Sequence, residues 1–201
     1  MIVEWEKIRG VVLDFDCTIT IDHTGGRADS PDELQDEYIK NNTKNGFVEF
    51  VHASKKQGIG LWIATYGDDE FALSPTDVAG HELVGRYMDV LFGADQSVFR
   101  QPLRDELEEI SRHQNVIAKY SGDRKAFHWN IIQTQMGAGF KPEEILFLDD
   151  SQANLDYAKE LGCELMVSGA SDKAALVCAS DRLFELLLDR MRKTGVTDVV
   201  E

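Results

Sequence analysis

The chain has 201 residues, 43% of them hydrophobic, and a formal net charge of −15. This length and apolar content suit one domain with a buried core, and we expect a single domain over residues 1–201. The acidic excess argues against nucleic acid and anionic membrane surfaces as main partners, because both bind clusters of Lys and Arg.

The cysteines and the N-terminal residues indicate the cellular compartment in which the protein works. Three cysteines without the spacing of a disulfide framework are typical of a reducing environment. Residues 1–6 lack the basic start and the long apolar run of a secretory signal, and no apolar run is long enough to span a membrane. We therefore expect a cytoplasmic protein, whose oligomeric state the sequence leaves open.

Short apolar runs alternate with helical patterns along the chain. The predicted strands are 8–14, 59–65, 89–93, 145–149 and 163–167. The predicted helices are 46–57, 74–88, 103–112, 122–137, 151–161 and 174–192, with 115–120 ambiguous and 194–201 a frayed tail. This alternation predicts an α/β fold, a Rossmann-like three-layer sandwich with a central parallel sheet.

Polar groups follow the three clearest strands of this predicted sheet. They are Asp14 and Asp16, then Thr65, then Asp149 and Asp150. Parallel sheets bind ligands outside the carboxyl ends of their strands. Residues i and i+2 of an extended chain point to the same side, so Asp14 and Asp16 can face one pocket. Two close carboxylates repel, so the pair either binds a proton or shares a cation such as Mg²⁺.

Each of these groups also has an ordinary structural interpretation. An acidic pair after a strand can form a polar turn, and Asp149 and Asp150 can cap the next helix. Thr65 can be a strand-end hydroxyl, Lys125 a solvated lysine and Asn154 an exposed helical residue. Their occurrence together, at the ends of successive elements, is what favours a catalytic site.

Together these residues resemble the four motifs of the haloacid dehalogenase superfamily of phosphatases, in the family's order. The matching segments are Leu13-Asp14-Phe15-Asp16-Cys17-Thr18, then Thr65 at a strand end, then Lys125 at a helix start, then Asp149-Asp150 with Asn154 downstream. The rivals of Lys125 for the third motif are Arg124, Lys119 and Lys141. The motifs span residues 8–154, so the resemblance covers most of the chain.

The resemblance implies Mg²⁺-dependent hydrolysis of a phosphomonoester. Asp14 would be the nucleophile that forms an aspartyl-phosphate, and Asp16 would be the general acid and base. Mg²⁺ would bind the Asp14 carboxylate, the Asp16 backbone carbonyl and Asp150. Thr65 and Lys125 would hold the phosphate, and Lys125 would also hold Asp14 in place.

Three neighbours would support this set. Matching Asp150 and Asn154 to the family's acidic positions makes Asp149 a near neighbour of the metal ligand and puts an amide where the family has an acid. Thr18 would orient Asp16 through its hydroxyl or support the turn.

The segment 21–45 is short for the helical cap of many small-metabolite phosphatases in the family. We expect a short flap or minimal cap there, similar to that of the family's magnesium-dependent phosphatases and carboxy-terminal-domain phosphatases. A second short insertion covers residues 94–121. His23, Arg27 and Tyr66 are candidates for substrate contact, and Arg27 could pair with an anionic group, although each could equally be a polar surface residue.

The substrate stays open between a phosphorylated small molecule and a phosphoprotein. Two other functions also stay open: a catalytically weak or inactive binding or regulatory protein of the same fold, and a phosphotransferase or mutase. The intact set of Asp14, Asp16, Thr65 and Asp150 argues against the first, and the small cap argues against the second.

Overall fold

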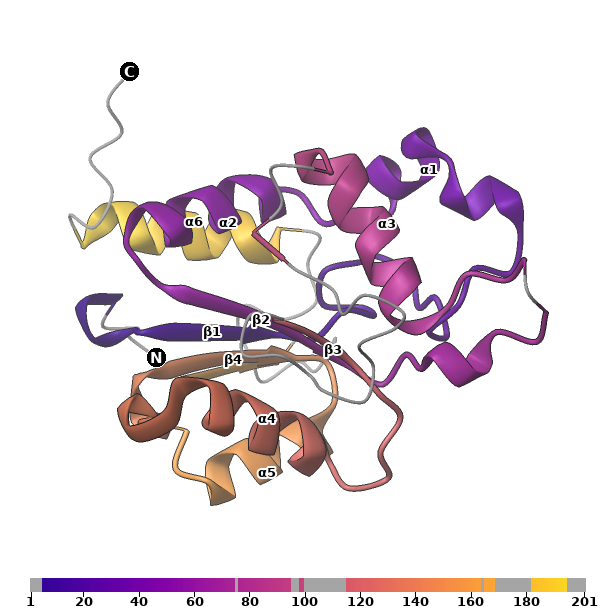
Figure 1. Cartoon of the computed structure of the whole chain (residues 1–201). Coiled ribbons are helices and arrows are strands. Elements are labelled where there is room, and N and C mark those ends of the chain that lie inside the picture. Colours follow the sequence, from indigo (N-terminus) through magenta and orange to yellow (C-terminus); the bar gives the residue numbers. More distant parts are fainter. Residues whose placement is uncertain are drawn as a thin grey trace.

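The computed structural model describes residues 5–74, 76–94, 98–99, 115–163, 165–168 and 182–194, and the structural statements below concern these residues. Its centre is a parallel sheet in the order β3-β2-β1-β4-β5 (Figure 1). The strands are β1 (Gly10–Leu13), β2 (Gly60–Thr65), β3 (Val116–Ala118), β4 (Ile145–Asp149) and β5 (Leu165–Ser168). The predicted α/β fold class is confirmed.

Helices cover both faces of the sheet (Figure 1). One face carries α2 (Phe47–Lys56), α3 (Gly80–Phe92) and α6 (Leu183–Lys193), with α1 (Asp36–Asn41) packed against α3. The other face carries α4 (Ala126–Met136) and α5 (Gln152–Glu160). Short 3₁₀ helices are η1 (Trp5–Lys7), η2 (Pro31–Leu34), η3 (Asp69–Phe71), η5 (Gly137–Gly139) and η6 (Pro142–Glu144).

Side chains of the central strand, β1, alternate between two hydrophobic cores, one on each face of the sheet. Val11 and Leu13 belong to the core under α2, α3 and α6, whereas Val12 packs in the core that contains Trp129 of α4. Every residue of β1 and β4 is buried. A strand covered on both faces needs apolar side chains on both, which is why these strands appear in the sequence as continuous apolar runs.

Two predicted elements differ from the structure. The predicted strand at 89–93 is wrong, because residues 89–92 are the last turn of α3, and a short apolar run cannot distinguish a buried helix end from a strand. The strand that pairs with β2 is β3, in the segment left ambiguous. The helix predicted to start at Ser74 begins instead at Gly80, and the Ser74 N–H donates to Asp77 Oδ2 at 2.9 Å.

Some predicted elements fall outside the described residues. The predicted helix 103–112 lies there entirely, together with residues 174–181 of the predicted last helix and all of the predicted tail beyond Thr194. Among the described residues, no helix combines the length and the apolar character needed to cross a membrane.

The sheet order places the ends of β1 and β4 at its switch point. The chain moves from β1 to β2 and β3 on one side and later returns to β4 and β5 on the other side. Leu13 lies opposite Leu148 in register, and the Asp14 N–H donates to the Leu148 carbonyl at 2.8 Å. Asp14 and Asp149 therefore emerge side by side, in the crevice where open α/β sheets bind ligands.

Residues 21–45, here called the flap, lie against the loop that follows β2. The flap contains η2 and α1 and is tied down at its far end, where the Asn42 side chain donates to Tyr87 Oη at 3.0 Å. Gly26 approaches Gly67 so closely that a Cβ on Gly26 would lie 2.6 Å from Gly67 Cα. The flap therefore lies at the carboxyl edge of the sheet, and its role as a minimal cap stays a prediction.

Candidate active site

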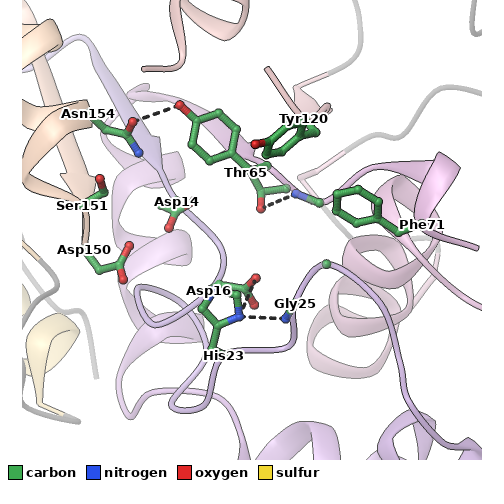
Figure 2. Close-up of a pocket in the computed structure, with 13 residues that line it drawn as sticks. Asp14, Asp16, His23, Gly25, Thr65, Phe71, Tyr120, Asp150, Ser151 and Asn154 are labelled. Carbon is green, nitrogen blue, oxygen red and sulfur yellow. Dashed lines mark hydrogen bonds and ion pairs between the residues drawn. The ribbon is translucent and has the colours of Figure 1, made fainter. Parts of the chain in front are cut away.

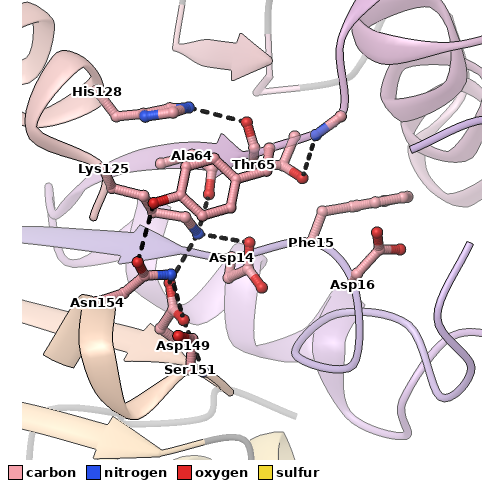
Figure 3. Close-up of polar contacts among 12 residues, drawn as sticks. Asp14, Phe15, Asp16, Ala64, Thr65, Lys125, His128, Asp149, Ser151 and Asn154 are labelled. Carbon is pink, nitrogen blue, oxygen red and sulfur yellow. Dashed lines mark hydrogen bonds and ion pairs between the residues drawn. The ribbon is translucent and has the colours of Figure 1, made fainter. Parts of the chain in front are cut away.

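A buried lysine joins the ends of three strands (Figure 3). Lys125 Nζ donates to Asp14 Oδ1 at 2.6 Å and to Asp149 Oδ2 at 2.7 Å. Its third hydrogen bond, at 2.6 Å, goes to the carbonyl of Ala64 in β2. An ammonium group has three donors, and all three are used here. The lysine thus fixes the ends of β1, β2 and β4 relative to one another.

The local backbone aims this side chain inward. Lys125 precedes α4 in the left-handed conformation with φ of 66°, directly after Arg124 with φ of 57°. Left-handed conformations of residues other than glycine are uncommon, and they gather where a structure needs one exact side-chain direction.

The rivals for the third motif pair with acids elsewhere. Arg124 binds Glu160 at 3.0 Å, Lys141 binds Glu144 at 2.9 Å, and Lys119 binds Asp68 at 2.9 Å. Each of these three cations is at least 41% exposed in its side chain, whereas Lys125 is 1% exposed. Of the four candidates, Lys125 is the one that the structure brings to Asp14.

Burial and neighbouring charges shift the pKa values of the ionisable groups at this site. Burial raises the pKa of Asp14 well above its ordinary value, and Asp149 and Asp150 add to the rise while Lys125 opposes it. Burial also raises the pKa of Asp150, with Asp149 adding to the effect. Burial alone would lower the pKa of Lys125, but Asp14 and Asp149 outweigh it and raise that pKa, so the lysine stays charged.

Three carboxylates form a candidate cation site among the described residues. Asp14, Asp149 and Asp150 each offer an oxygen within 4.8 Å of the others. Because a single ammonium, that of Lys125, binds within this cluster, the ionised group carries an excess of negative charge that a divalent cation would balance. Oxygen ligands are those that Mg²⁺ prefers, so the donor set fits this ion.

Both carboxylate oxygens of Asp149 already accept hydrogen bonds, so this residue is less available as a ligand for a cation. Its Oδ2 accepts from Lys125, and its Oδ1 accepts from the Ser151 N–H at 2.8 Å. Asn154 Nδ2 donates to both oxygens, at 3.0 and 3.1 Å. Asp14 and the half-buried Asp150 are therefore the carboxylates left for a cation. The Asp16 carboxylate is not in the cluster, and the role of its backbone carbonyl stays a prediction.

Asn154 and Tyr66 form a chain of contacts behind Asp149. The Tyr66 hydroxyl donates to Asn154 Oδ1 at 3.1 Å, and this orients the amide so that Nδ2 points at Asp149. Asn154 thus helps to fix the position of the Asp149 carboxylate, which binds Lys125. An amide suits this position better than an acid, since a further carboxylate would repel Asp149.

Asp16 is held apart from this cluster by the flap (Figure 2). Its Oδ1 accepts from both the N–H and the hydroxyl of Thr24, at 2.9 and 2.6 Å. His23 Nδ1 lies 3.6 Å from Asp16 Oδ2, but that nitrogen accepts the Gly25 N–H at 2.8 Å and is not a donor to Asp16. Thr24 is a site residue that the sequence reasoning missed.

The prediction that the Thr18 hydroxyl orients Asp16 is wrong. Thr18 is fully buried, and its Oγ1 has no hydrogen-bond partner among the described residues. The chain leaves the extended conformation at Cys17, where φ is 57°, so Thr18 turns into the core. The only signal for Thr24 was its place in the glycine-flanked loop, because a contact across eight residues of irregular chain has no characteristic spacing.

Thr65 presents its hydroxyl at the end of β2. Its Oγ1 accepts the Gly67 N–H at 3.2 Å, which leaves the hydroxyl proton for another acceptor. Its carbonyl lies 2.8 Å from His128 Nε2, a second contact that the sequence did not predict. Burial lowers the pKa of His128 to about 3, with Lys125 adding to the effect, so the imidazole is neutral and donates through Nε2.

A pocket of about 380 Å³ lies over these groups (Figure 2). Its lining includes the predicted residues Asp14, Asp16, His23, Thr65, Tyr66, Asp150 and Asn154. Arg27 does not line it. That side chain borders a neighbouring pocket and binds Asp29 Oδ1 at 3.0 Å.

Comparisons with known proteins leave the family open. No family model and no curated protein matches the chain. A solved structure of DsGPDH of Dunaliella salina matches with a TM-score of 0.48 and 13% identity, covering 82% of this chain and 24% of that one. The chain thus spans about a quarter of that protein's length, and a likeness this weak carries no functional argument.

Proposed function

We propose that the chain is a Mg²⁺-dependent phosphomonoester hydrolase of the haloacid dehalogenase type. The observation that carries the proposal is the Lys125 ammonium, which bridges Asp14 and Asp149 at 2.6 and 2.7 Å at the switch point of the sheet. A buried cation placed beside a carboxylate, with a hydroxyl and a candidate cation site next to it, suits a phosphoryl group and an in-line nucleophile.

Asp14 suits the role of nucleophile. Lys125 binds one oxygen, Oδ1, which fixes the carboxylate and favours its ionised form against the cost of burial. The other oxygen attacks phosphorus, the new Asp14–phosphorus bond forms, and the bond to the leaving oxygen breaks. Mg²⁺ held by Asp14, Asp150 and the Asp16 carbonyl would neutralise charge on the phosphoryl oxygens. Thr65 donates a hydrogen bond to the same oxygens, and the charge of the nearby Lys125 ammonium attracts them.

Asp16 suits the acid–base role. Thr24 holds its Oδ1, and Oδ2 is left to give a proton to the leaving oxygen. In the second step Asp16 takes a proton from water as the water oxygen attacks phosphorus. The Asp14–phosphorus bond then breaks, which releases phosphate and restores both carboxyl groups.

Hydrolysis of 4-nitrophenyl phosphate tests the proposal. Activity should require Mg²⁺, and Asp14→Asn should lower kcat by at least about 10³-fold because it removes the nucleophile. Asp89→Asn is a matched control, since Asp89 is exposed on α3. A folded wild-type protein that hydrolyses no member of a broad panel of phosphomonoesters would refute the proposal, as would full activity of Asp14→Asn.

A further inference from the structure

One side of the pocket is aromatic. Tyr66, Phe71 and Tyr120, here called the aromatic wall, belong to its lining. Phe71 and Tyr120 lie across from Asp14 and Asp150 (Figure 2). The Tyr66 and Tyr120 rings meet edge to face with centroids 5.9 Å apart, and the Phe71 and Tyr120 centroids are 6.1 Å apart. Tyr120 is 61% exposed, so much of its ring is uncovered.

A buried carboxylate holds the aromatic wall in position. Asp68 accepts the Glu70 N–H at 3.1 Å and the Tyr120 N–H at 3.0 Å. It thereby ties η3, which carries Phe71, to the segment that follows β3 and carries Tyr120. Asp68 therefore fixes the backbone of the two segments that carry the Phe71 and Tyr120 rings.

The flap leaves this surface open to the pocket. Gly25 and Gly26 line the pocket beside Phe71 and contribute no side chains. A Cβ on Gly26 would lie 3.1 Å from the Phe71 ring. A side chain at Gly26 would therefore crowd the Phe71 ring and clash with the Gly67 backbone.

The charges along the lining restrict what can lie against the aromatic wall. Among the residues that the structure describes, the lining of the pocket includes Asp14, Asp16 and Asp150 but neither Lys nor Arg. Lys125 lies beneath them and already binds two carboxylates, and Lys119 binds Asp68 and Glu70 at 2.9 and 3.2 Å. A second phosphate or a carboxylate on the substrate would therefore meet acidic groups in this pocket without a matching cation.

We propose that the preferred substrate carries a single phosphate ester and an uncharged planar ring, which packs against Tyr120 and Phe71. This inference rests on the proposed hydrolase function and adds the class of its leaving group. A pocket of about 380 Å³ has room for one phosphate and one ring system. Packing between aromatic rings adds a modest attraction beyond apolar burial, worth roughly 3- to 10-fold in an equilibrium constant.

The test compares benzyl phosphate with cyclohexylmethyl phosphate. Both release a primary alcohol of similar size, so they differ mainly in the aromatic character of the ring. We expect kcat/KM to favour benzyl phosphate by about 3- to 10-fold, mainly through KM. Tyr120→Ala should bring the ratio close to one, and Tyr120→Phe should preserve it. Phe127→Ala, which removes a 37% exposed ring outside the pocket lining, should not change the ratio.

The outcomes separate this inference from the proposed function. Hydrolysis of both esters with equal kcat/KM, or a ratio that Tyr120→Ala leaves unchanged, overturns the aromatic preference and leaves the hydrolase intact. If neither of these esters nor any other member of the phosphomonoester panel is hydrolysed, the proposed function fails, and calorimetric titration of the wild type with benzylphosphonate and cyclohexylmethylphosphonate still tests the ring site. Equal Kd values for the two phosphonates would then overturn the inference.

Discussion

The floor of the pocket and the flap beside it are built in different ways. The floor consists of Asp14, Lys125 and Asp149, which are at most 6% exposed and linked by short charged hydrogen bonds. The flap reaches Asp16 through one residue, Thr24, next to a His23 side chain that is 66% exposed. The floor joins strand ends and so contributes to folding, whereas the flap orients a single carboxylate. Substitutions in the two regions should therefore separate stability from activity.

Lys125→Met should have the largest effect, on both properties. It leaves Asp14 and Asp149 buried without their cation, which costs about 3–5 kcal/mol when a buried pair loses one partner. The pKa of Asp14 should rise further, so the folded variant binds protons more readily than the unfolded chain, and its stability should fall as pH rises. Urea denaturation at pH values from about 4 to about 8 measures this.

Lys141→Met is the matched control for that substitution. Lys141 is 57% exposed in its side chain and pairs with Glu144 on the surface, where such pairs contribute at most about 1 kcal/mol. If Lys125→Met costs no more than this control, the floor does not hold the strand ends together as described.

Asp16→Asn should lower activity strongly and stability little. The amide oxygen can still accept from both Thr24 donors, so the flap keeps its contacts. Loss of the general acid should lower kcat/KM, which reports the leaving-group step, by about 10²- to 10⁴-fold for alkyl phosphates. The loss should be smaller for 4-nitrophenyl phosphate, whose leaving oxygen needs little protonation. An equal loss for both substrates would contradict the acid–base role of Asp16.

Thr24→Val should have a smaller effect of the same kind. It removes the hydroxyl donor at 2.6 Å but keeps the backbone donor, so we expect about a 10-fold loss in kcat for alkyl phosphates. Thr24→Ser should restore most of the rate, because it keeps the hydroxyl. A uniform loss for alkyl and 4-nitrophenyl phosphates, or a loss that Ser does not restore, would indicate a general change in the flap.

The sequence predicts the floor better than the flap for a physical reason. Asp14 and Asp149 directly follow buried strands, and the parallel register of β1 and β4 brings their ends together wherever such strands pair. The placement of Thr65 at the end of β2 follows from the same rule. Lys125 was harder to select among four cations, since its direction depends on two left-handed residues that no periodicity marks.

The flap contacts could not be predicted because they depend on irregular chain. The roles of Thr18 and Thr24 are decided by one left-handed residue at Cys17, which turns the first inward and lets the second reach Asp16. The contact between Tyr66 and Asn154 spans 88 residues and requires the finished sheet. The sequence predicts a strand at the end of α3 because the short apolar run Val90-Leu91-Phe92 is compatible with either period.

The smallest predicted effect concerns the pH dependence of stability at the end of β2, beside the floor. His128 Nε2 donates to the Thr65 carbonyl at 2.8 Å, and its buried Nδ1 has no partner among the described residues. Its pKa is about 3 in the folded state, against 6.5 for an unperturbed histidine. Below about pH 6.5 the unfolded chain binds a proton that the folded state refuses, so stability falls as pH decreases toward about 3.

His128→Gln should remove this dependence. Between about pH 7 and pH 5, the wild type should lose about 1–2 kcal/mol more than the variant in the free energy of unfolding. His52→Gln is the control, because His52 is exposed on α2, away from the pocket lining. Equal slopes for all three proteins would mean that the folded chain accepts the proton at His128. The hydrogen bond that fixes the end of β2 would then tolerate a charged imidazole, and the floor would be less closed to solvent than its burial implies.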